Sequence, residues 1–294
     1  MNSVLLFTEN QWAFGSLHHA LIKRLWDHRI YANLINWGIC YTTKEHQYFQ
    51  HRYRQVCTPI DGISALLASG WPASKIIGVA HSERDIVLTL SRHEESIVDQ
   101  LKGYAVVNKS MVKVSADLGI RRVPTVVRVG VDTEFFTMPL PAKLHTMGYA
   151  GAKTFEMSNK SECKRGHLIP KVIEGLDISL NEHAFYNHFA MPGYYSDIDA
   201  VLVTSNYETV GLPALEAAAA GRLSFGARVG YFDGSYGHLC RTPDDEFVAD
   251  AREAISRYTK DREAFRIACI NVRQAVRDQY DWGKCVVDWV SLFD

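Results

Sequence analysis

The residues best suited to chemistry lie in segment 205–221, which reads SNYETVGLPALEAAAAG. Two acidic residues, Glu208 and Glu216, are separated by seven residues in this segment. A carboxylate accepts hydrogen bonds from paired hydroxyl groups, such as those of a sugar. Glu208 falls just before an expected helix and Glu216 about one turn inside it. The spacing therefore allows both carboxylates to face one polyhydroxylated ligand.

The same segment predicts an anion site at the start of a helix. Pro213 is tolerated in a first helical turn, and Gly221 supplies a C-terminal stop. N–H groups at a helix N-terminus stabilise an anion. The residues whose N–H groups would do so here are Thr209, Val210, Gly211 and Leu212. The spacing alone equally allows Glu208 to be a helix cap and Glu216 to be a solvated helix residue.

Composition excludes several classes of protein. The chain has 294 residues and a formal net charge of −1, with 47% hydrophobic and 22% charged residues. This length suggests two domains or one large one, and this composition is that of a folded globular protein rather than a disordered one. No apolar run approaches the roughly 18–20 residues of a membrane span, and the N-terminus lacks a basic signal region. We therefore expect a cytoplasmic protein.

Six cysteines without CxxC spacing predict free thiols and no metal site.

Short apolar strands alternate with helices, which is typical of a parallel α/β sheet. Strands are expected at 4–7, 34–37, 75–80, 104–107 and 125–129, then at 145–150, 177–180, 200–204 and 223–226. Pro139 and Pro141 between the two series indicate a linker. Two α/β halves around a cleft follow, with ligands expected beyond the carboxyl ends of the strands.

Segment 205–221 resembles the Glu-x7-Glu signature of the family 4 retaining glycosyltransferases, which have the GT-B fold. Residues 105–136 and 281–293 resemble further stretches of that family, in the expected order. The resemblance implies a Rossmann-like acceptor domain over 1–141 and a Rossmann-like donor domain over 142–279. A C-terminal helix over 280–294 would return to the first domain. Residues 177–198 look too brief for the usual strand–helix–strand unit, so we expect a shortened second domain.

The resemblance also assigns roles to matching positions. Glu208 would contact hydroxyls of the donor sugar, and Glu216 the ribose hydroxyls of the nucleotide. The backbone of 209–212 would meet the sugar and the diphosphate. Gly15 resembles part of the loop that approaches the donor phosphates, although a plain strand–turn–helix connection also explains it. His81, at the end of an expected strand, would lie near the donor sugar and the acceptor, unless it is a structural histidine.

Cations are needed to neutralise a diphosphate. The arginine that the family places after the first strand of its second domain is absent here, and Lys153 stands one position away. Lys164 or Arg165, before the next helix, would take the second role. Two such cations would stabilise a leaving diphosphate without a metal ion. Each lysine is alternatively a solvated loop charge.

The predicted function is metal-independent, retaining transfer of a hexose from a nucleoside diphosphate sugar to a hydroxyl. The co-substrate would be UDP-glucose or a related UDP-sugar, and no cofactor is expected. The acceptor would be a glycan, a small molecule or modified DNA. Segment 41–54 mixes aromatic and basic residues, which suits a phosphate-rich acceptor but also a solvated amphipathic helix.

Other functions stay open on the sequence. They are a viral-type DNA glucosyltransferase acting on hydroxymethylated bases, an epimerase or phosphorylase of the same fold, and a non-catalytic protein that binds sugar nucleotides or glycans.

Overall fold

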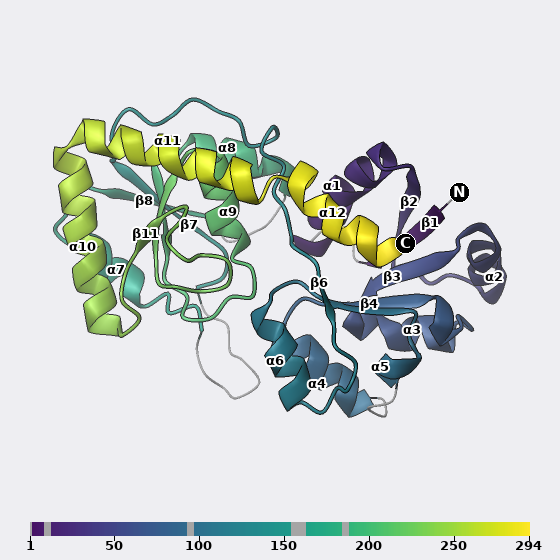
Figure 1. The fold of residues 1–294 in the computed structure, drawn as a ribbon. Helices are drawn as coiled ribbons and strands as arrows, with labels where there is room; N and C mark the ends of the chain where they lie inside the picture. Colours follow the sequence, from purple (N-terminus) through teal and green to yellow (C-terminus); the bar gives the residue numbers. More distant parts are fainter. Residues whose placement is uncertain (1, 9–12, 93–96, 154–162, 184–187) are drawn as a thin grey trace. The chain divides into compact units, whose positions relative to one another are not determined.

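The structure is a computed structural model that describes residues 2–8, 13–92, 97–153, 163–183 and 188–294. The chain divides into two compact units (Figure 1). The first comprises Met1–Gly130 together with Trp282–Asp294, and the second comprises Val131–Asp281. The divisions thus follow Gly130 and Asp281, whereas the sequence placed the first joint at Pro139–Pro141.

The first unit is built on a six-stranded parallel sheet in the order β2-β1-β3-β4-β5-β6. Its strands are β1 (Asn2–Thr8), β2 (Ile30–Asn36), β3 (Gln55–Pro59), β4 (Ile76–Ala80), β5 (Gly103–Val106) and β6 (Thr125–Val126). The central strands are apolar because helices cover both of their faces, and every residue of β3, β4 and β5 is buried.

Helices connect these strands and one returns from the end of the chain. They are α1 (Ala13–Asp27), α2 (Thr43–Arg52), α3 (Ile63–Ala68), α4 (Glu83–Arg92), α5 (Ile97–Gln100), α6 (Ser110–Asp117) and α12 (Trp282–Phe293), with 3-10 turns η1 (Ile60–Gly62) and η2 (Ala73–Lys75). The Gln55 side chain donates to the Phe293 carbonyl at 2.7 Å, and Arg128 forms a 2.7 Å ion pair with Asp288. These contacts hold α12 against the first unit.

The second unit contains a five-stranded parallel sheet in the order β11-β10-β9-β7-β8. Its strands are β7 (Thr146–Ala150), β8 (Ser179–His183), β9 (Ala200–Val203), β10 (Leu223–Gly226) and β11 (His238–Leu239). Its helices are α7 (Leu168–Ile173), α8 (Met191–Ser196), α9 (Leu212–Ala219), α10 (Asp244–Lys260) and α11 (Arg262–Gln279), with the 3-10 turn η3 (His188–Ala190). Six residues of α9, from Ala214 to Ala219, are buried, so this short helix lies in the core beside β9.

The expected α/β class is confirmed, and the differences are local. Segment 41–57, which shows no clear period, forms α2 and then the start of the fully buried strand β3. A capping box between Thr42 and Glu45 begins α2. Segment 177–198 holds a strand, a 3-10 turn and the six-residue helix α8, so the second sheet keeps its strand–helix–strand unit in a compressed form. Within the described residues, no helix has the length and apolar character of a membrane span.

Gly148 on β7 provides a test of the packing in the second unit. A Cβ there would lie 2.3 Å from Ile198 Cδ1 and 2.6 Å from the Tyr194 hydroxyl. We expect Gly148→Ala to lower the free energy of unfolding by about 1–3 kcal/mol, as overpacking does. Gly193→Ala on α8 is the matched control, because no described atom lies within 4 Å of its Cβ. Urea denaturation in which Gly148→Ala is as stable as Gly193→Ala would contradict this packing.

Candidate functional site

The loop between β9 and α9 ends in an unusual backbone conformation. Gly211, the N-cap of α9, has φ 81° and ψ 50°, in the left-handed region that glycine adopts at little cost. Pro213 occupies the first turn, and no side chain caps the helix. The first N–H groups of a helix have no intrahelical acceptor, and the helix dipole adds a partial positive charge. The turn therefore presents a position suited to an anion, as the sequence predicts for 209–212.

Glu208 lies in this loop in contact with Lys164. Lys164 Nζ is 2.5 Å from Glu208 Oε1, and the Ser205 hydroxyl donates to the same oxygen at 2.8 Å. The side chain of Lys164 is 25% exposed and that of Glu208 is 19% exposed, so a ligand can reach this partly shielded ion pair. The carboxylate of Glu208 therefore contacts a cation and a hydroxyl rather than capping α9. Two of the predicted site residues are brought together by this contact.

Arg165 turns in the other direction, into the protein. Its side chain is 5% exposed, and its Nε donates to the Thr204 carbonyl at 2.7 Å. Its guanidinium also forms a 2.9 Å ion pair with Asp244 and lies 5.1 Å from the centre of the Phe247 ring. Arg165 itself has a left-handed backbone, with φ 49°. The guanidinium therefore connects separate segments of the second unit through these contacts.

Lys153 takes a third direction. Its Nζ forms a 2.7 Å ion pair with Glu182 on β8, and both side chains are considerably exposed. Its carbonyl accepts a hydrogen bond from the Gly166 N–H at 3.0 Å. The sequence offers three cations for a diphosphate. Arg165 contacts the start of the β9–α9 loop at the Thr204 carbonyl, and Lys164 contacts the Glu208 carboxylate further along the same loop.

Glu216 is buried in α9 rather than solvated. It is 5% exposed, and the Tyr195 hydroxyl lies 3.1 Å from Glu216 Oε2. His188 Nδ1 lies 3.7 Å from Oε1 of the same carboxylate. The Tyr195 hydroxyl is also 3.1 Å from the Pro213 carbonyl, which ties it to the start of α9. Tyr195 thus sets the position of the Glu216 carboxylate.

His188 and its neighbours were not foreseen from the sequence. Phe135 stacks on the His188 ring with centroids 5.3 Å apart and an interplanar angle of 23°. Phe136 meets the same ring edge-on at 5.8 Å. Both phenylalanines end segment 105–136, whose likeness to the family was noted. His188 lies in segment 177–198, which looks too brief in sequence for the usual strand–helix–strand unit.

His81 belongs to the first unit, at the carboxyl end of β4. The backbone N–H groups of His81 and Ser82 donate to Asp85 Oδ2 at 3.0 and 2.9 Å. The His18 ring lies 6.2 Å away, edge-on. Burial, with a smaller contribution from His18, lowers the pKa of His81 to about 3. The imidazole is therefore neutral near pH 7, and it can form hydrogen bonds but adds no positive charge.

Gly15 lies inside α1, which begins at Ala13. The expectation that a loop runs to Gly15 is therefore wrong, since the helix starts two residues earlier. Residues 9–12, which follow β1, lie outside the described residues. As for metals, no cluster of three or more His, Cys, Asp or Glu side chains suited to a metal ion occurs in the part of the chain that the structure describes.

Comparison with known proteins shows the fold. No protein-family model matches the sequence, and no curated protein matches it significantly. Among solved structures, sucrose-phosphate synthase from Thermosynechococcus elongatus is similar over 100% of this chain and 98% of its own, with a TM-score of 0.68 and 13% identity. It is a glycosyltransferase of the GT-B type. This chain has the GT-B fold.

Two further GT-B structures resemble it to the same degree. The catalytic domain of starch synthase IV from Arabidopsis thaliana, bound to ADP and acarbose, has a TM-score of 0.69 and 11% identity, covering 100% of this chain and 98% of that one. An alpha-glucosyltransferase in complex with UDP and a 13-mer DNA containing a HMU base has a TM-score of 0.70 and 10% identity, covering 100% of both chains. At such identities the likeness establishes the architecture and leaves the activity to be argued from the site.

The pKa of His81 makes stability depend on pH. An unfolded histidine has a pKa near 6.5, so below that pH the unfolded chain binds a proton that the folded chain excludes down to about pH 3. This part of the stability is present above pH 6.5 and is lost as the pH falls towards 3. Between pH 7 and pH 5, the free energy of unfolding of His81→Phe should fall by about 2 kcal/mol less than that of the wild type. Urea denaturation at the two pH values measures this difference. Equal losses in the two proteins would place the pKa of His81 near its ordinary value.

Proposed function

We propose that this protein is a retaining glycosyltransferase that transfers a hexose from a UDP-sugar to a hydroxyl acceptor without a metal ion. The observation that carries the proposal is the contact of Lys164 with Glu208 beside the N-terminus of α9. A cation, a carboxylate and a helix N-terminus in one place suit the charged and the polyhydroxylated parts of a nucleotide-sugar. The GT-B fold supports the proposal, because the three solved structures compared above are glycosyltransferases.

The donor would bind within the second unit. Its diphosphate would lie at the N–H groups of 209–212 with Lys164 beside it, and Glu208 would accept hydrogen bonds from sugar hydroxyls. Glu216 would accept hydrogen bonds from the ribose. It is already oriented by Tyr195, so little side-chain entropy remains to be lost on binding.

In the proposed reaction the bond between the anomeric carbon and the diphosphate oxygen breaks, and a bond from that carbon to the acceptor oxygen forms on the same face. The acceptor proton goes to the departing diphosphate oxygen. Lys164 and the helix N-terminus would stabilise the negative charge that develops there. In this proposal Glu208 would not act as a nucleophile, because its carboxylate, which pairs with Lys164, would accept hydrogen bonds from the sugar hydroxyls.

Donor binding would break the ion pair between Lys164 and Glu208, because Lys164 would then contact the diphosphate. We expect Glu208→Gln to bind UDP roughly 3–10-fold more tightly than the wild type, since Lys164 is released and a nearby negative charge is removed. Transfer should fall by at least about 100-fold. Calorimetric titration with UDP and a turnover assay measure both effects.

The matched control is Glu182→Gln, which releases Lys153 from an ion pair of similar length. Its UDP affinity should equal that of the wild type. UDP binding by Glu208→Gln that is no tighter than that of the wild type would show that the ion pair does not compete with UDP. Turnover at the wild-type rate would remove Glu208 from the donor site.

The ribose role of Glu216 gives a second test. We expect Glu216→Gln to raise the dissociation constant of UDP by about 10–100-fold, because hydrogen bonds to a charged acceptor contribute roughly 1.5–3 kcal/mol. Affinity for inorganic pyrophosphate should stay constant, since that ligand has no ribose. Tyr195→Phe should weaken UDP binding in the same selective way but to a smaller extent. An equal loss for UDP and pyrophosphate would show that Glu216 acts through the fold instead.

Independence from metal ions is tested by chelation. If Lys164 and the helix N-terminus neutralise the leaving diphosphate, then EDTA at millimolar concentration should leave the rate of transfer unchanged. Loss of transfer that added Mn²⁺ or Mg²⁺ restores would contradict the metal-free reaction.

A second candidate is a glucosyltransferase that acts on hydroxymethylated bases in DNA. The observation in its favour is that the alpha-glucosyltransferase solved with UDP and DNA matches the chain over the full length of both. A panel of UDP-, GDP- and ADP-sugars, combined with glycan, small-molecule and hydroxymethylated DNA acceptors, identifies both substrates. Analysis of the anomeric configuration of the product distinguishes retaining transfer from the chemistry of an epimerase or phosphorylase. Lack of turnover with every donor would favour a non-catalytic binding protein.

A further inference from the structure

Three aromatic rings stack on the first unit, and one of them, Tyr53, belongs to the aromatic and basic segment 41–54. Trp26 and Tyr31 are nearly parallel, at 14° with ring centroids 6.3 Å apart, and Tyr31 and Tyr53 lie at 9° and 6.0 Å. The stack runs from the buried Tyr53 to Trp26, which is 55% exposed. The indole N–H of Trp26 donates to the Ala32 carbonyl on the edge strand β2 at 2.9 Å. That bond fixes the ring and leaves one of its faces towards solvent.

The stack lies at the amino-terminal ends of the strands of the six-stranded sheet. Tyr31 is the second residue of β2 and pairs in register with Ser3 near the start of β1. The backbone N–H of Arg54, just before β3, donates to the Ser3 hydroxyl at 3.0 Å. His81, in contrast, follows the carboxyl end of β4. The stack and His81 therefore lie at opposite ends of the parallel strands.

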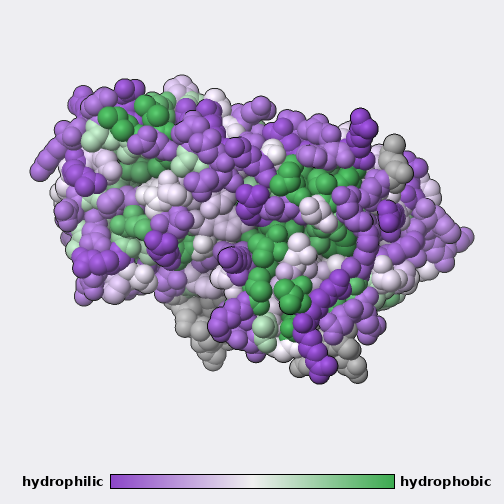
Figure 2. Space-filling view, in the orientation of Figure 1, coloured by the Kyte–Doolittle hydropathy of each residue, from purple (hydrophilic) through white to green (hydrophobic). Residues whose placement is uncertain are grey.

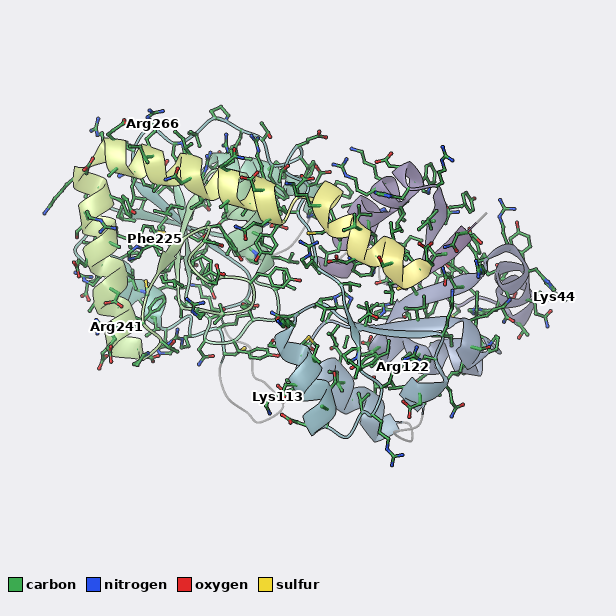
Figure 3. All side chains as sticks on the ribbon, in the orientation of Figure 1. Lys44, Lys113, Arg122, Phe225, Arg241 and Arg266 are labelled. Atoms are coloured by element: carbon green, nitrogen blue, oxygen red, sulfur yellow. The ribbon has the colours of Figure 1, made fainter. Side chains whose placement is uncertain are left out.

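The segment of the chain that carries the stack is rich in positive charge. Between Lys23 and Arg54 the chain has six Lys and Arg residues but two acidic ones, although its overall formal charge is −1. The acidic residues are Asp27, which is exposed, and Glu45, which is engaged in the capping box of α2. The Arg52 guanidinium lies 5.7 Å from the centre of the Tyr31 ring. In Figure 2 the surface over α2 is hydrophilic, and Lys44 at the start of that helix points away from the unit in Figure 3.

Arg29 is held next to the stack at a conformational cost. It follows α1 with a φ of 61°, and its N–H donates to the Trp26 carbonyl at 2.9 Å. Glycine is the usual residue in this left-handed position after a helix, and another residue there costs roughly 1 kcal/mol or more. The chain thus keeps an exposed cation next to Trp26 where glycine would be more stable.

We propose that this surface, formed by Trp26, Tyr31, Arg29, Arg52 and Arg54, binds single-stranded nucleic acid. An unpaired base would stack on the open face of Trp26, and the arginines would contact the phosphates on either side. Fixed aromatic rings among cations are the usual means by which proteins hold single strands. A duplex covers the faces of its bases except at its two ends, so along its length it gives Trp26 nothing to stack on. This inference goes beyond the proposed glycosyl transfer and does not require it.

Fluorescence anisotropy of the full chain with a labelled 15-mer of oligothymidylate, in low salt, tests the proposal. We expect Trp26→Ala to weaken binding by about 5–100-fold, because stacking contributes roughly 1–3 kcal/mol per base. We expect Arg29→Gly to weaken binding and to reduce the slope of log affinity against log salt by about 0.7, the value for one lost phosphate contact. Because glycine relieves the left-handed backbone, a loss of binding in that variant does not arise from unfolding.

Lys113→Gln is the control, since Lys113 is an exposed cation of the same unit on α6 (Figure 3). It should bind the oligonucleotide as the wild type does. Affinity that is insensitive to Trp26→Ala, equal affinity for a blunt duplex or for heparin, or no binding at about 100 μM protein would each overturn the proposal. UDP titration of the same variants separates the two functions, because Trp26→Ala and Arg29→Gly should retain wild-type UDP affinity whichever way the oligonucleotide result falls.

Discussion

The second unit depends on the buried guanidinium of Arg165. A buried charge costs several kcal/mol unless partners satisfy it, and here the Thr204 carbonyl and the Asp244 carboxylate do so at 2.7 and 2.9 Å. The Thr204 hydroxyl in turn donates to the carbonyl of Lys164. The loop before α7, the end of β9 and the start of α10 are thereby joined at one point. That connection holds Lys164 next to Glu208, so the geometry of the proposed donor site follows from a residue that would not touch the donor.

This division of labour separates two adjacent cations. Arg165 is fixed by its protein partners, whereas Lys164 has a partly exposed partner that a ligand could replace. Without a donor, the positive charge of Lys164 is balanced by Glu208. When a diphosphate binds, Lys164 would exchange the Glu208 carboxylate for a phosphate oxygen, so its positive charge would stay paired. Glu216 is different again, because Tyr195 and the buried position on α9 hold its carboxylate in place before any ligand binds.

Much of this could be predicted from the sequence, since apolar runs and the Gly211–Pro213 turn are local signals. The sheet class and the position of α9 are of that kind. The sequence did not predict strand β3, because only two residues separate its five residues from the end of a polar helix. The choice between Lys164 and Arg165 could not be made, because it depends on Thr204 and Asp244, which are distant in the chain. Tyr195 and His188 were missed for the same reason, since only tertiary packing brings them to Glu216.

The most direct test of the account is a crystal structure of the protein with UDP. The account predicts that Lys164 Nζ leaves Glu208 and lies within hydrogen-bond distance of a diphosphate oxygen at the start of α9, with the ribose hydroxyls on Glu216. Arg165 should keep its contacts with Thr204 and Asp244. UDP bound elsewhere, or bound with Lys164 still paired to Glu208 and Arg165 turned towards the phosphates, would contradict it.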